Sequence, residues 1–295
     1  MIQIHFIVNP IAGHGSSSLS KAFLESYFIG SVHQITVKYS EYKKHAIQLT
    51  KESIEEKAAI IVACGGDGTI NEVASCLVGI AIPLGIIPIG SGNGLASNLK
   101  IPKNLRKALA VIRSNRTIKM DVGKINNRFF FSNTGVGFDA EVIKHYESKK
   151  KRSFLGYVYA CLTSIKKIEH QETIEISFNN EIRIINPFII LISNSNEMGY
   201  HLSLTPKASL QDGLLDVLII SKINRLKIFW LGILVLIGKI NWLNEAKNYQ
   251  VKALELSRND QSFLESQIDG EFHKLEKDSI KITVIEKALS VLVPS

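Results

Sequence analysis

The sequence predicts two domains: an N-terminal α/β domain built on a parallel sheet, and a C-terminal β-rich domain of sandwich type. In the first 121 residues, short apolar strands alternate with helical stretches, which is the pattern of a parallel sheet covered on both faces. After that point many short strands follow with few helices between them. We expect residues 1–121 and about 288–295 to form the α/β domain, and residues 122–287 to form the β-rich one.

Each expected element of the first domain is an apolar run or a helical pattern that follows one. Three glycine-rich loops, at residues 9–15, 65–69 and 90–94, follow the carboxyl ends of expected strands. Because these ends meet at one edge of a parallel sheet, where such folds bind ligands, we expect the loops to form one site. Strands are expected at residues 2–8, 32–39, 59–63 and 83–89, and helices at 18–28, 42–56, 70–77 and 104–114.

The second domain contains an apolar run, residues 228–238, that bears on membrane contact. Its eleven residues fall short of the roughly 20 that a membrane-spanning helix needs, so we expect a buried core helix. Trp230 and Trp242 near its ends keep a membrane-facing helix open as an alternative. Strands are expected at residues 129–133, 173–178, 188–193, 215–221, 252–256 and 281–285, and helices at 154–168 and 226–237.

The composition narrows the class of protein and its partners. Three cysteines without a Cys-x-x-Cys pair provide neither a disulfide framework nor a zinc knuckle, which fits a reducing cytoplasm. The N-terminus has no basic region before its short apolar run, so it reads as a first strand rather than a signal peptide. The net charge of +8 favours anionic partners such as nucleotides, nucleic acid or an acidic membrane surface.

A basic run at Lys149–Arg152 precedes the helix expected at residues 154–168. Such a run could bind an anionic leaflet, although a solvated loop is the commoner outcome. No aromatic residues interleave with these charges, so nucleic acid is not expected as a partner.

The segment Gly65-Gly66-Asp67-Gly68-Thr69 carries the strongest chemical signal. Glycines let backbone N–H groups approach phosphate oxygens, and a helix beginning near Thr69 would point its positive end at the same place. A carboxylate in such a loop repels phosphate unless a cation lies between them, so Asp67 indicates Mg²⁺ bound with a nucleotide. A plain strand-to-helix turn is the alternative.

Other phosphate and nucleophile motifs are absent from the sequence. Neither the Gly-x-x-x-x-Gly-Lys-Ser/Thr phosphate loop nor the Gly-x-Ser-x-Gly elbow of serine hydrolases occurs. The His-Glu-x-x-His zinc motif is missing as well, and the loop at residues 90–94 lacks the spacing of the dinucleotide fingerprint.

Taken in order, the motifs resemble those of the diacylglycerol kinase catalytic family, which includes bacterial soluble lipid kinases and the sphingosine and ceramide kinases. The resemblance runs across nearly the whole chain. Gly-Gly-Asp-Gly-Thr alone is shared with NAD kinases, whereas the ordered set is highly specific. The matching segments are Asn9-Pro10 with Gly13, Gly65 to Glu72, Pro88 to Asn93, Asp212-Gly213 and Asp269-Gly270-Glu271.

The resemblance implies that this chain binds ATP and Mg²⁺, and it assigns roles to individual residues. Asp212 would hold a structural Mg²⁺ together with the backbone carbonyls of Ser209 and Leu214. Asp269 and Glu271 would handle the substrate hydroxyl. The nucleotide would contact Asn9, Pro10 and Gly13, Ser40 in place of the family's usual Thr, Gly65, Gly66, Asp67, Gly68, Thr69 and Asn71 around the phosphates, and Ser91 and Asn93 on the third loop.

Phosphoryl transfer also requires an acid–base group on chemical grounds. An alcohol that attacks a γ-phosphate loses its proton, which a positioned carboxylate accepts. We assign Glu271 as the base and Asp269 to Mg²⁺ or water organisation, with the reverse assignment open, and take Asp67 as the third catalytic residue. A hairpin turn at Asp269-Gly270-Glu271 is the alternative.

The third loop bears on the identity of the acceptor. Bacterial soluble diacylglycerol kinases usually carry Gly-Thr-x-Asn-Asp there, whereas Gly90–Ala96 looks more like the sphingosine and ceramide kinases. The resemblance therefore implies an ATP-dependent lipid kinase that acts on diacylglycerol, a sphingoid base or a related lipid alcohol. An NAD kinase-like phosphotransferase and a non-catalytic nucleotide- or lipid-binding protein stay open. We expect a cytoplasmic protein that meets its lipid peripherally at the inner face of the membrane, with a homodimer left open.

Overall fold

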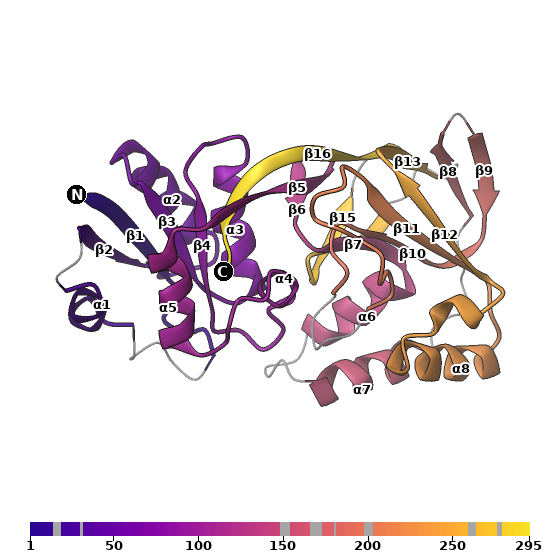
Figure 1. Cartoon of the computed structure of the whole chain (residues 1–295). Coiled ribbons are helices and arrows are strands. Elements are labelled where there is room, and N and C mark those ends of the chain that lie inside the picture. Colours follow the sequence, from indigo (N-terminus) through magenta and orange to yellow (C-terminus); the bar gives the residue numbers. More distant parts are fainter. Residues whose placement is uncertain are drawn as a thin grey trace. The chain divides into compact units, whose positions relative to one another are not determined.

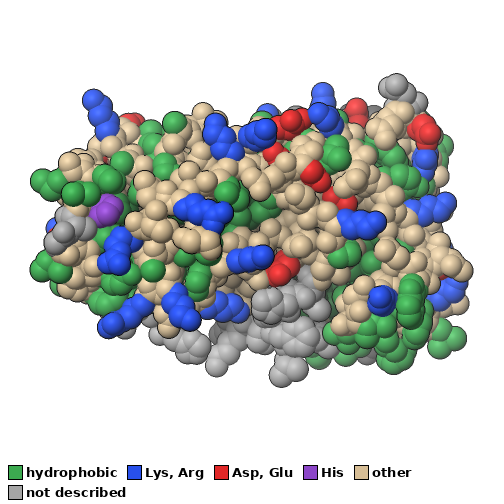
Figure 2. Space-filling view, viewed as in Figure 1, with side chains coloured by type: hydrophobic (Ala, Val, Ile, Leu, Met, Phe, Trp, Pro, Cys, Tyr) green, Lys and Arg blue, Asp and Glu red, His purple; other side chains and the backbone are tan. Residues whose placement is uncertain are grey.

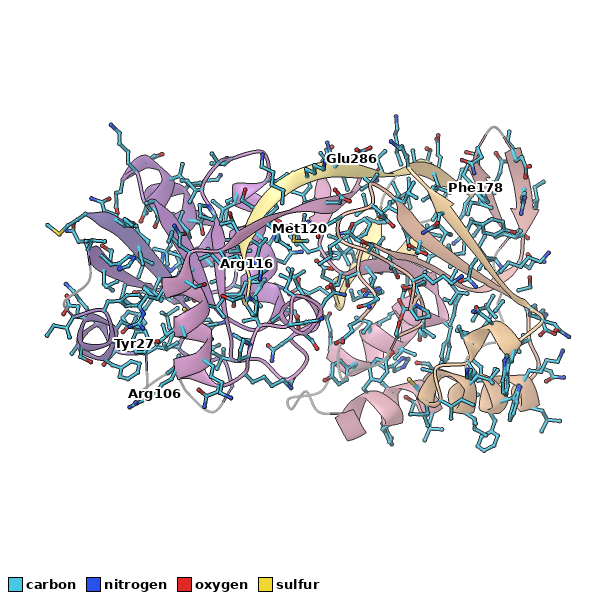
Figure 3. All side chains as sticks on the ribbon, in the orientation of Figure 1. Tyr27, Arg106, Arg116, Met120, Phe178 and Glu286 are labelled. Carbon is cyan, nitrogen blue, oxygen red and sulfur yellow. The ribbon has the colours of Figure 1, made fainter. Side chains whose placement is uncertain are left out.

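The chain folds into two units, residues 1–120 with 287–295 and residues 121–286. Met120 and Glu286, labelled in Figure 3, are the residues at which the chain passes between them. Some segments that the sequence singled out lie outside the described residues. They are the basic run Lys149–Arg152, residues 14–15 of the first loop, residue 18 of the first expected helix, and residues 166–168 of the helix expected at 154–168. The computed structural model describes residues 1–13, 19–29, 32–147, 154–165, 173–179, 181–197, 203–258, 264–275 and 279–295.

The first unit is built on a parallel sheet (Figure 1). Strands β1 (Ile2–Val8), β2 (His33–Tyr39), β3 (Ile60–Gly65) and β4 (Leu84–Pro88) pair in the order β2-β1-β3-β4. The end of β16 (Ser279–Leu292) lies parallel to β4. Every residue of β3 and β4 is buried, which explains their continuous apolar runs. The connecting helices are α1 (Lys21–Tyr27), α2 (His45–Glu55), α3 (Asp67–Leu77), α4 (Gly94–Asn98) and α5 (Leu105–Ser114).

Two helices of this unit begin at other residues than the sequence predicts. The predicted start of α2 at residue 42 is wrong, because Lys44 has a left-handed φ of 72° and the helix begins after it, at His45. The predicted start of α3 at residue 70 is wrong as well. The apolar periodicity begins at Ile70, but the helix already begins at Asp67, so Asp67 lies in its first turn rather than in the loop before it.

Hydrogen bonds tie the C-terminal segment and α1 into the first unit. Arg116 donates from Nη1 to the carbonyl oxygen of Pro294 at 2.8 Å, and the N–H of Val293 donates to the carbonyl oxygen of Arg116 at 2.9 Å. Tyr27 of α1 donates to the carbonyl oxygen of Arg106 of α5 at 3.2 Å (Figure 3). The last residues of the chain thus belong to the same core as the first.

The second unit contains two antiparallel sheets packed as a sandwich. One sheet has the order β12-β11-β10-β7-β14-β15. The other contains β16-β13-β8-β9, with β5 paired to β16 and β6 paired to β5. The strands are β5 (Thr117–Ile125), β6 (Arg128–Phe130), β7 (Asn133–Gly137), β8 (Ile174–Phe178), β9 (Glu181–Ile185), β10 (Pro187–Ser193), β11 (Leu215–Ser221), β12 (Ala246–Val251), β13 (Ala253–Ser257), β14 (Leu264–Ile268) and β15 (Glu271–Leu275). The helices are α6 (Phe138–Glu147), α7 (Phe154–Ser164), α8 (Arg225–Leu236) and the 3₁₀ turn η2 (Ile240–Trp242).

Strand β11 shows how the first of these sheets is buried on both sides. Leu215, Val217 and Ile219 point into the sandwich core, while Leu218 and Ile220 pack on the opposite face against α8 and η2. Because both sets are apolar, residues 217–220 form an uninterrupted apolar stretch. The predicted two-domain fold, α/β followed by a β-rich sandwich, is confirmed.

Some elements of the second unit depart from the sequence prediction. The strand expected at residues 129–133 is wrong as a single element, because β6 ends at Phe130 and β7 begins at Asn133. The backbone N–H groups of residues 131–133 bond to a side chain, Asp269, rather than to a neighbouring strand. Strands β9, β12 and β15 end their sheets and are partly exposed, so their apolar pattern is weak. Within the described residues, no helix is long and apolar enough to cross a bilayer.

Replacing Gly123 by Ala is expected to destabilise the second unit. A methyl group there would lie 2.1 Å from Cζ of Phe130, whose ring is fully buried. The free energy of unfolding, measured by urea denaturation, should fall by about 1–3 kcal/mol. The same change at Gly232 in α8 meets nothing within 4 Å and should be neutral or stabilise by up to about 1 kcal/mol. Equal effects of the two substitutions would contradict this packing.

Candidate functional site

Three loops of the first unit meet at the carboxyl edge of its parallel sheet. A Cβ on Gly90 would lie 2.6 Å from the Cα of Gly66, so the second and third loops touch backbone to backbone. A Cβ on Gly13, whose φ is +65°, would lie 2.6 Å from the carbonyl oxygen of Ile89. Any side chain at these positions would separate the loops. The three loops therefore form one surface, as the strand order predicts.

The carboxylate of Asp67 fixes the third loop onto the second. Its Oδ2 accepts the backbone N–H of Asn93 at 2.8 Å, and its Oδ1 accepts the backbone N–H of Gly94 at 2.8 Å. Charge-assisted bonds of this kind are stronger than neutral ones. They also give the carboxylate partners other than a cation. Asp67 by itself is therefore no longer a reason to infer Mg²⁺.

Asn9 fixes the first loop onto the second. Its Nδ2 donates to Oγ1 of Thr69 at 3.1 Å, and its Oδ1 accepts the backbone N–H of Ile11 at 3.1 Å. Thr69 in turn packs on Gly65, where a Cβ would lie 2.5 Å from the Thr69 Cβ. One hydroxyl and one amide thus join two loops that are 60 residues apart in sequence.

The same edge offers hydrogen-bond donors to an anion. Helix α3 begins after Gly66 with no side-chain cap, so the N–H groups of its first turn have no intrahelical acceptor. The positive end of the helix dipole points the same way. The buried Asn93 stabilises the third loop rather than adding a donor: its Nδ2 donates to the carbonyl oxygen of Gly90 at 2.5 Å, and its Oδ1, which has no partner among the described residues, is an acceptor. This surface can hold phosphate groups.

The other residues predicted to bind a nucleotide also belong to the first unit. Ser40 follows β2, and its N–H donates to the carbonyl oxygen of Val8 at 2.9 Å. Pro10 and Ser91 are exposed on their loops. Asn71 lies within α3 rather than on a loop, and its Oδ1 accepts the hydroxyl of Ser75 at 3.3 Å.

In the second unit, Asp269 and Gly270 form the turn of the β14–β15 hairpin. Ile268 pairs with Glu271, and the two turn residues have φ values of 47° and 79°. Two positive φ values in a two-residue loop define a type I′ turn, for which Asp-Gly is a preferred sequence. The hairpin that the sequence left as an alternative is therefore present, and it places both acidic residues at one end of the hairpin.

The carboxylate of Asp269 binds backbone beyond its own hairpin. Its Oδ2 accepts the N–H of Phe131 at 2.9 Å, and its Oδ1 accepts those of Ser132 at 2.8 Å and Asn133 at 3.1 Å. Three donors on one carboxylate fix the segment between β6 and β7 to the turn. Glu271, half-buried as the first residue of β15, is then the better candidate for proton transfer.

The side chain of Gln267 holds this turn in place, a role that the sequence analysis did not predict. Its Oε1 accepts the N–H of Gly270 at 2.9 Å, while its Nε2 donates to Oδ1 of Asn133 at 2.6 Å and to Oδ2 of Asp139 at 2.8 Å. The side chain is buried and links the turn, β7 and α6. No local sequence pattern marks this role, because the partners Asn133 and Asp139 lie 134 and 128 positions away in the sequence.

Asp139 is a buried carboxyl in the first turn of α6. Burial raises its pKa to about 6, and the Gln267 hydrogen bond opposes this shift. Gly135 makes room for it, since a Cβ there would lie 2.5 Å from Oδ2. Burial also raises the pKa of Tyr157 and brings that of Cys161 to about 11, with Asp139 contributing to both, so these neighbours on α7 stay neutral at ordinary pH.

The loop at residues 209–214 is the predicted Mg²⁺ site. Asp212 is exposed, and its Oδ1 accepts the N–H of Leu214 at 3.1 Å. Asp121 holds the same loop, because its Oδ2 accepts the N–H of Gly213 at 2.7 Å. Burial, and to a lesser degree Asp212, raise the pKa of Asp216. An exposed carboxylate with backbone carbonyls suits a hard cation, although the described residues contain no group of three His, Cys, Asp or Glu that could hold a metal.

Two family models match the chain. Residues 3–125 match the diacylglycerol kinase catalytic domain, and residues 132–293 match the YegS C-terminal NAD kinase beta sandwich-like domain. A diacylglycerol kinase of Bacillus subtilis is 26% identical over 277 residues, which cover 92% of this chain and 90% of that protein.

Two further comparisons differ in how much of the other protein this chain covers. An uncharacterised Synechocystis protein is 31% identical over 230 residues, covering 74% of this chain and 53% of that protein, so the chain spans about half the length of that relative. A crystal structure from Bacillus anthracis, described as a candidate diacylglycerol kinase, matches with a TM-score of 0.81 and 21% identity over 99% of this chain and 95% of that one. The latter likeness shows a shared fold.

Replacing Asp139 by Asn is expected to change how stability depends on pH. The folded-state pKa of about 6 lies above the ordinary value of 3.8, so the unfolded chain ionises first and wild-type stability falls as pH rises through this range. Relative to wild type, the variant's free energy of unfolding should therefore rise from pH 4 to pH 7, by up to about 3 kcal/mol. Urea denaturation at several pH values measures this difference. A difference that stays constant with pH would contradict the assigned titration.

Proposed function

Because the chain belongs to the diacylglycerol kinase catalytic-domain family, with a YegS-type C-terminal domain, we propose that it transfers the γ-phosphate of ATP to a hydroxyl group of a lipid. The observation that carries the proposal is the surface where three loops of the first unit meet around the start of α3. A sheet edge with closely apposed glycine backbones and an uncapped helix N-terminus is suited to a polyphosphate.

On the nucleotide side, backbone groups would do most of the binding. In this proposal the N–H groups of loops 9–13, 65–69 and 90–94 contact the phosphates, and the side chains of Asn9 and Asp67 hold these loops in place. Ser40, Ser91 and Asn71 would contact the nucleotide from the neighbouring segments. A preformed set of donors stabilises the charge that spreads over the γ-phosphoryl oxygens during transfer.

On the acceptor side, we assign proton transfer to Glu271. The lipid hydroxyl oxygen forms the new bond to the γ-phosphorus, the bond from that phosphorus to the β–γ bridging oxygen breaks, and ADP leaves. Glu271 accepts the hydroxyl proton. Asp269 acts as a positioning residue, because its oxygens accept three backbone N–H groups.

Two Mg²⁺ roles follow from the family, and the residues present fit one of them directly. Asp212, with the carbonyls of Ser209 and Leu214, would hold a structural ion that stabilises the loop already fixed by Asp121. A Mg²⁺ ion that accompanies ATP would neutralise phosphate charge.

The acceptor we propose is diacylglycerol, a sphingoid base or a related lipid alcohol. The name of the Bacillus subtilis relative favours diacylglycerol, whereas the Gly90–Ala96 loop favours a wider choice. We place the reaction in the cytoplasm at the inner face of the membrane, where ATP and lipid meet.

The direct test is incubation with γ-labelled ATP, Mg²⁺ and mixed micelles containing diacylglycerol, monoacylglycerol, ceramide and sphingoid bases. A labelled lipid is the expected product. Labelled NADP, formed when NAD is supplied instead of lipid, would favour the NAD kinase alternative. The description of the second family model also names NAD kinase. ATP binding without any labelled product would favour a non-catalytic protein.

Replacing Glu271 by Gln is expected to lower kcat by about 10²- to 10⁴-fold, because the hydroxyl loses its proton acceptor. The affinity for ATP and the thermal midpoint should stay near wild type, since the side chain is only half-buried and Gln has nearly the same size. Replacing Asp269 by Asn is the comparison. The turn tolerates Asn, but the three backbone donors lose the negative charge and at least one of them loses its acceptor, so stability should fall by about 1–3 kcal/mol along with activity. If Asp269→Asn alone abolished turnover without a stability change, the assignments would have to be reversed.

A further inference from the structure

Helix α8 and the turn η2 present an unusually apolar outer surface. We use the name α8 face for Leu226, Phe229, Trp230, Leu236, Ile237 and Trp242. Leu226 is 82% exposed, Phe229 73%, Leu236 69% and Trp242 63%. Figure 2 shows hydrophobic side chains gathered over the position of α8 in Figure 1.

The α8 face is separate from the side of the helix that supports the fold. Ile228, Leu231 and Leu234 are buried in a cluster with residues of β10 and β11. Those inner residues pack the helix against the sheet. The predicted buried core helix is therefore buried on one side only, and its outer apolar residues are not required for packing. Large apolar surfaces of this kind usually mark a contact with a partner or a membrane.

The charged residues of the segment that carries the α8 face are mostly positive. Residues 222–247 contain five Lys or Arg residues and one acidic residue, Glu245. Glu245 is paired with Lys227, so the acidic group is already neutralised within the protein. Lys222, Lys239 and Lys247 are exposed. A second copy of the same face would bring cations against cations, whereas an anionic leaflet would attract them.

The C-terminal end of the α8 face has the chemistry of a membrane interface. Lys239 lies 5.8 Å from the centroid of the Trp242 ring, so an ammonium group and an indole ring adjoin the apolar surface. Trp and Lys side chains are common where a protein meets lipid headgroups, because each has an apolar body and a polar end. The twelve residues of α8 are too few to span a bilayer, but a helix of this length can lie in the plane of the interface.

We propose that the α8 face docks this protein on an anionic lipid bilayer, with Leu226, Phe229 and Leu236 entering the headgroup–acyl boundary. This inference rests on the proposed function in one respect, since a kinase for a water-insoluble alcohol has to reach its substrate in a bilayer. Docking gives the second unit a fixed orientation on the leaflet that supplies the lipid. The apolar contacts supply adhesion, and the lysines select negative leaflets.

The test is co-sedimentation with phosphatidylcholine vesicles that contain or lack phosphatidylglycerol. Wild type is expected to bind the anionic vesicles, with affinity falling as salt is raised. The double variant Leu226→Gln, Phe229→Gln should bind about tenfold or more weakly. The matched control is Ile182→Gln, Ile184→Gln on β9, which removes two side chains that are 68% and 67% exposed and should leave binding unchanged. Thermal unfolding of both variants shows that they fold.

Equal vesicle binding by wild type and the α8 double variant overturns the proposal. It is also overturned if sedimentation velocity shows a wild-type dimer that the α8 substitutions dissociate, since the face would then be an interface between two copies. Activity separates this inference from the proposed function. On a short-chain, water-soluble diacylglycerol the α8 variant should match wild type, while on vesicle-embedded diacylglycerol it should be slower. If the wild-type protein phosphorylates none of the lipids but still binds vesicles, the proposed function is refuted and the docking proposal stands.

Discussion

The bonds from the N–H groups of Asn93 and Gly94 to the carboxylate of Asp67 are the interaction on which the arrangement of the three loops at the carboxyl edge of the parallel sheet depends. Two glycine-rich loops that touch backbone to backbone gain little from side-chain packing, since neither contributes a Cβ at the contact. The carboxylate of Asp67, which accepts one N–H group on each oxygen, compensates for this weak packing. The loops thereby become a fixed array of donors before any ligand arrives, which is the condition for effective electrostatic stabilisation of phosphate charge.

The second unit uses the same physical device at its acidic turn. Asp269 accepts three N–H groups from the segment between β6 and β7, and Gln267 connects this turn to the buried Asp139. In both units, then, an acidic residue for which the motif suggests a catalytic role (Asp67 or Asp269) accepts backbone N–H groups and holds a loop in place. In the proposed mechanism, Asp269 therefore positions the backbone, and we assign proton transfer to Glu271.

Sequence reasoning reached the fold and the location of the glycine-rich loops because apolar runs and glycine spacing encode them directly. It could not separate the roles of Asp269 and Glu271, because the three donors to Asp269 come from residues more than 130 positions away. Gln267 and Asp139 escaped for the same reason, since a buried polar network is a property of the packed strands and not of local pattern. The two sides of α8 were indistinguishable in an apolar run, and only burial in the fold separates them.

Affinity for ATP in the Asp67→Asn variant, measured by calorimetry with and without Mg²⁺, tests the central claim most directly. An Asn at this position can accept one N–H but opposes the other with its own amide, so the third loop loosens. The predicted result is a loss of about tenfold or more in affinity, present equally when EDTA removes Mg²⁺. An affinity loss that is seen only with Mg²⁺ would show that Asp67 acts on the cation, and no loss at all would show that the three loops do not depend on it.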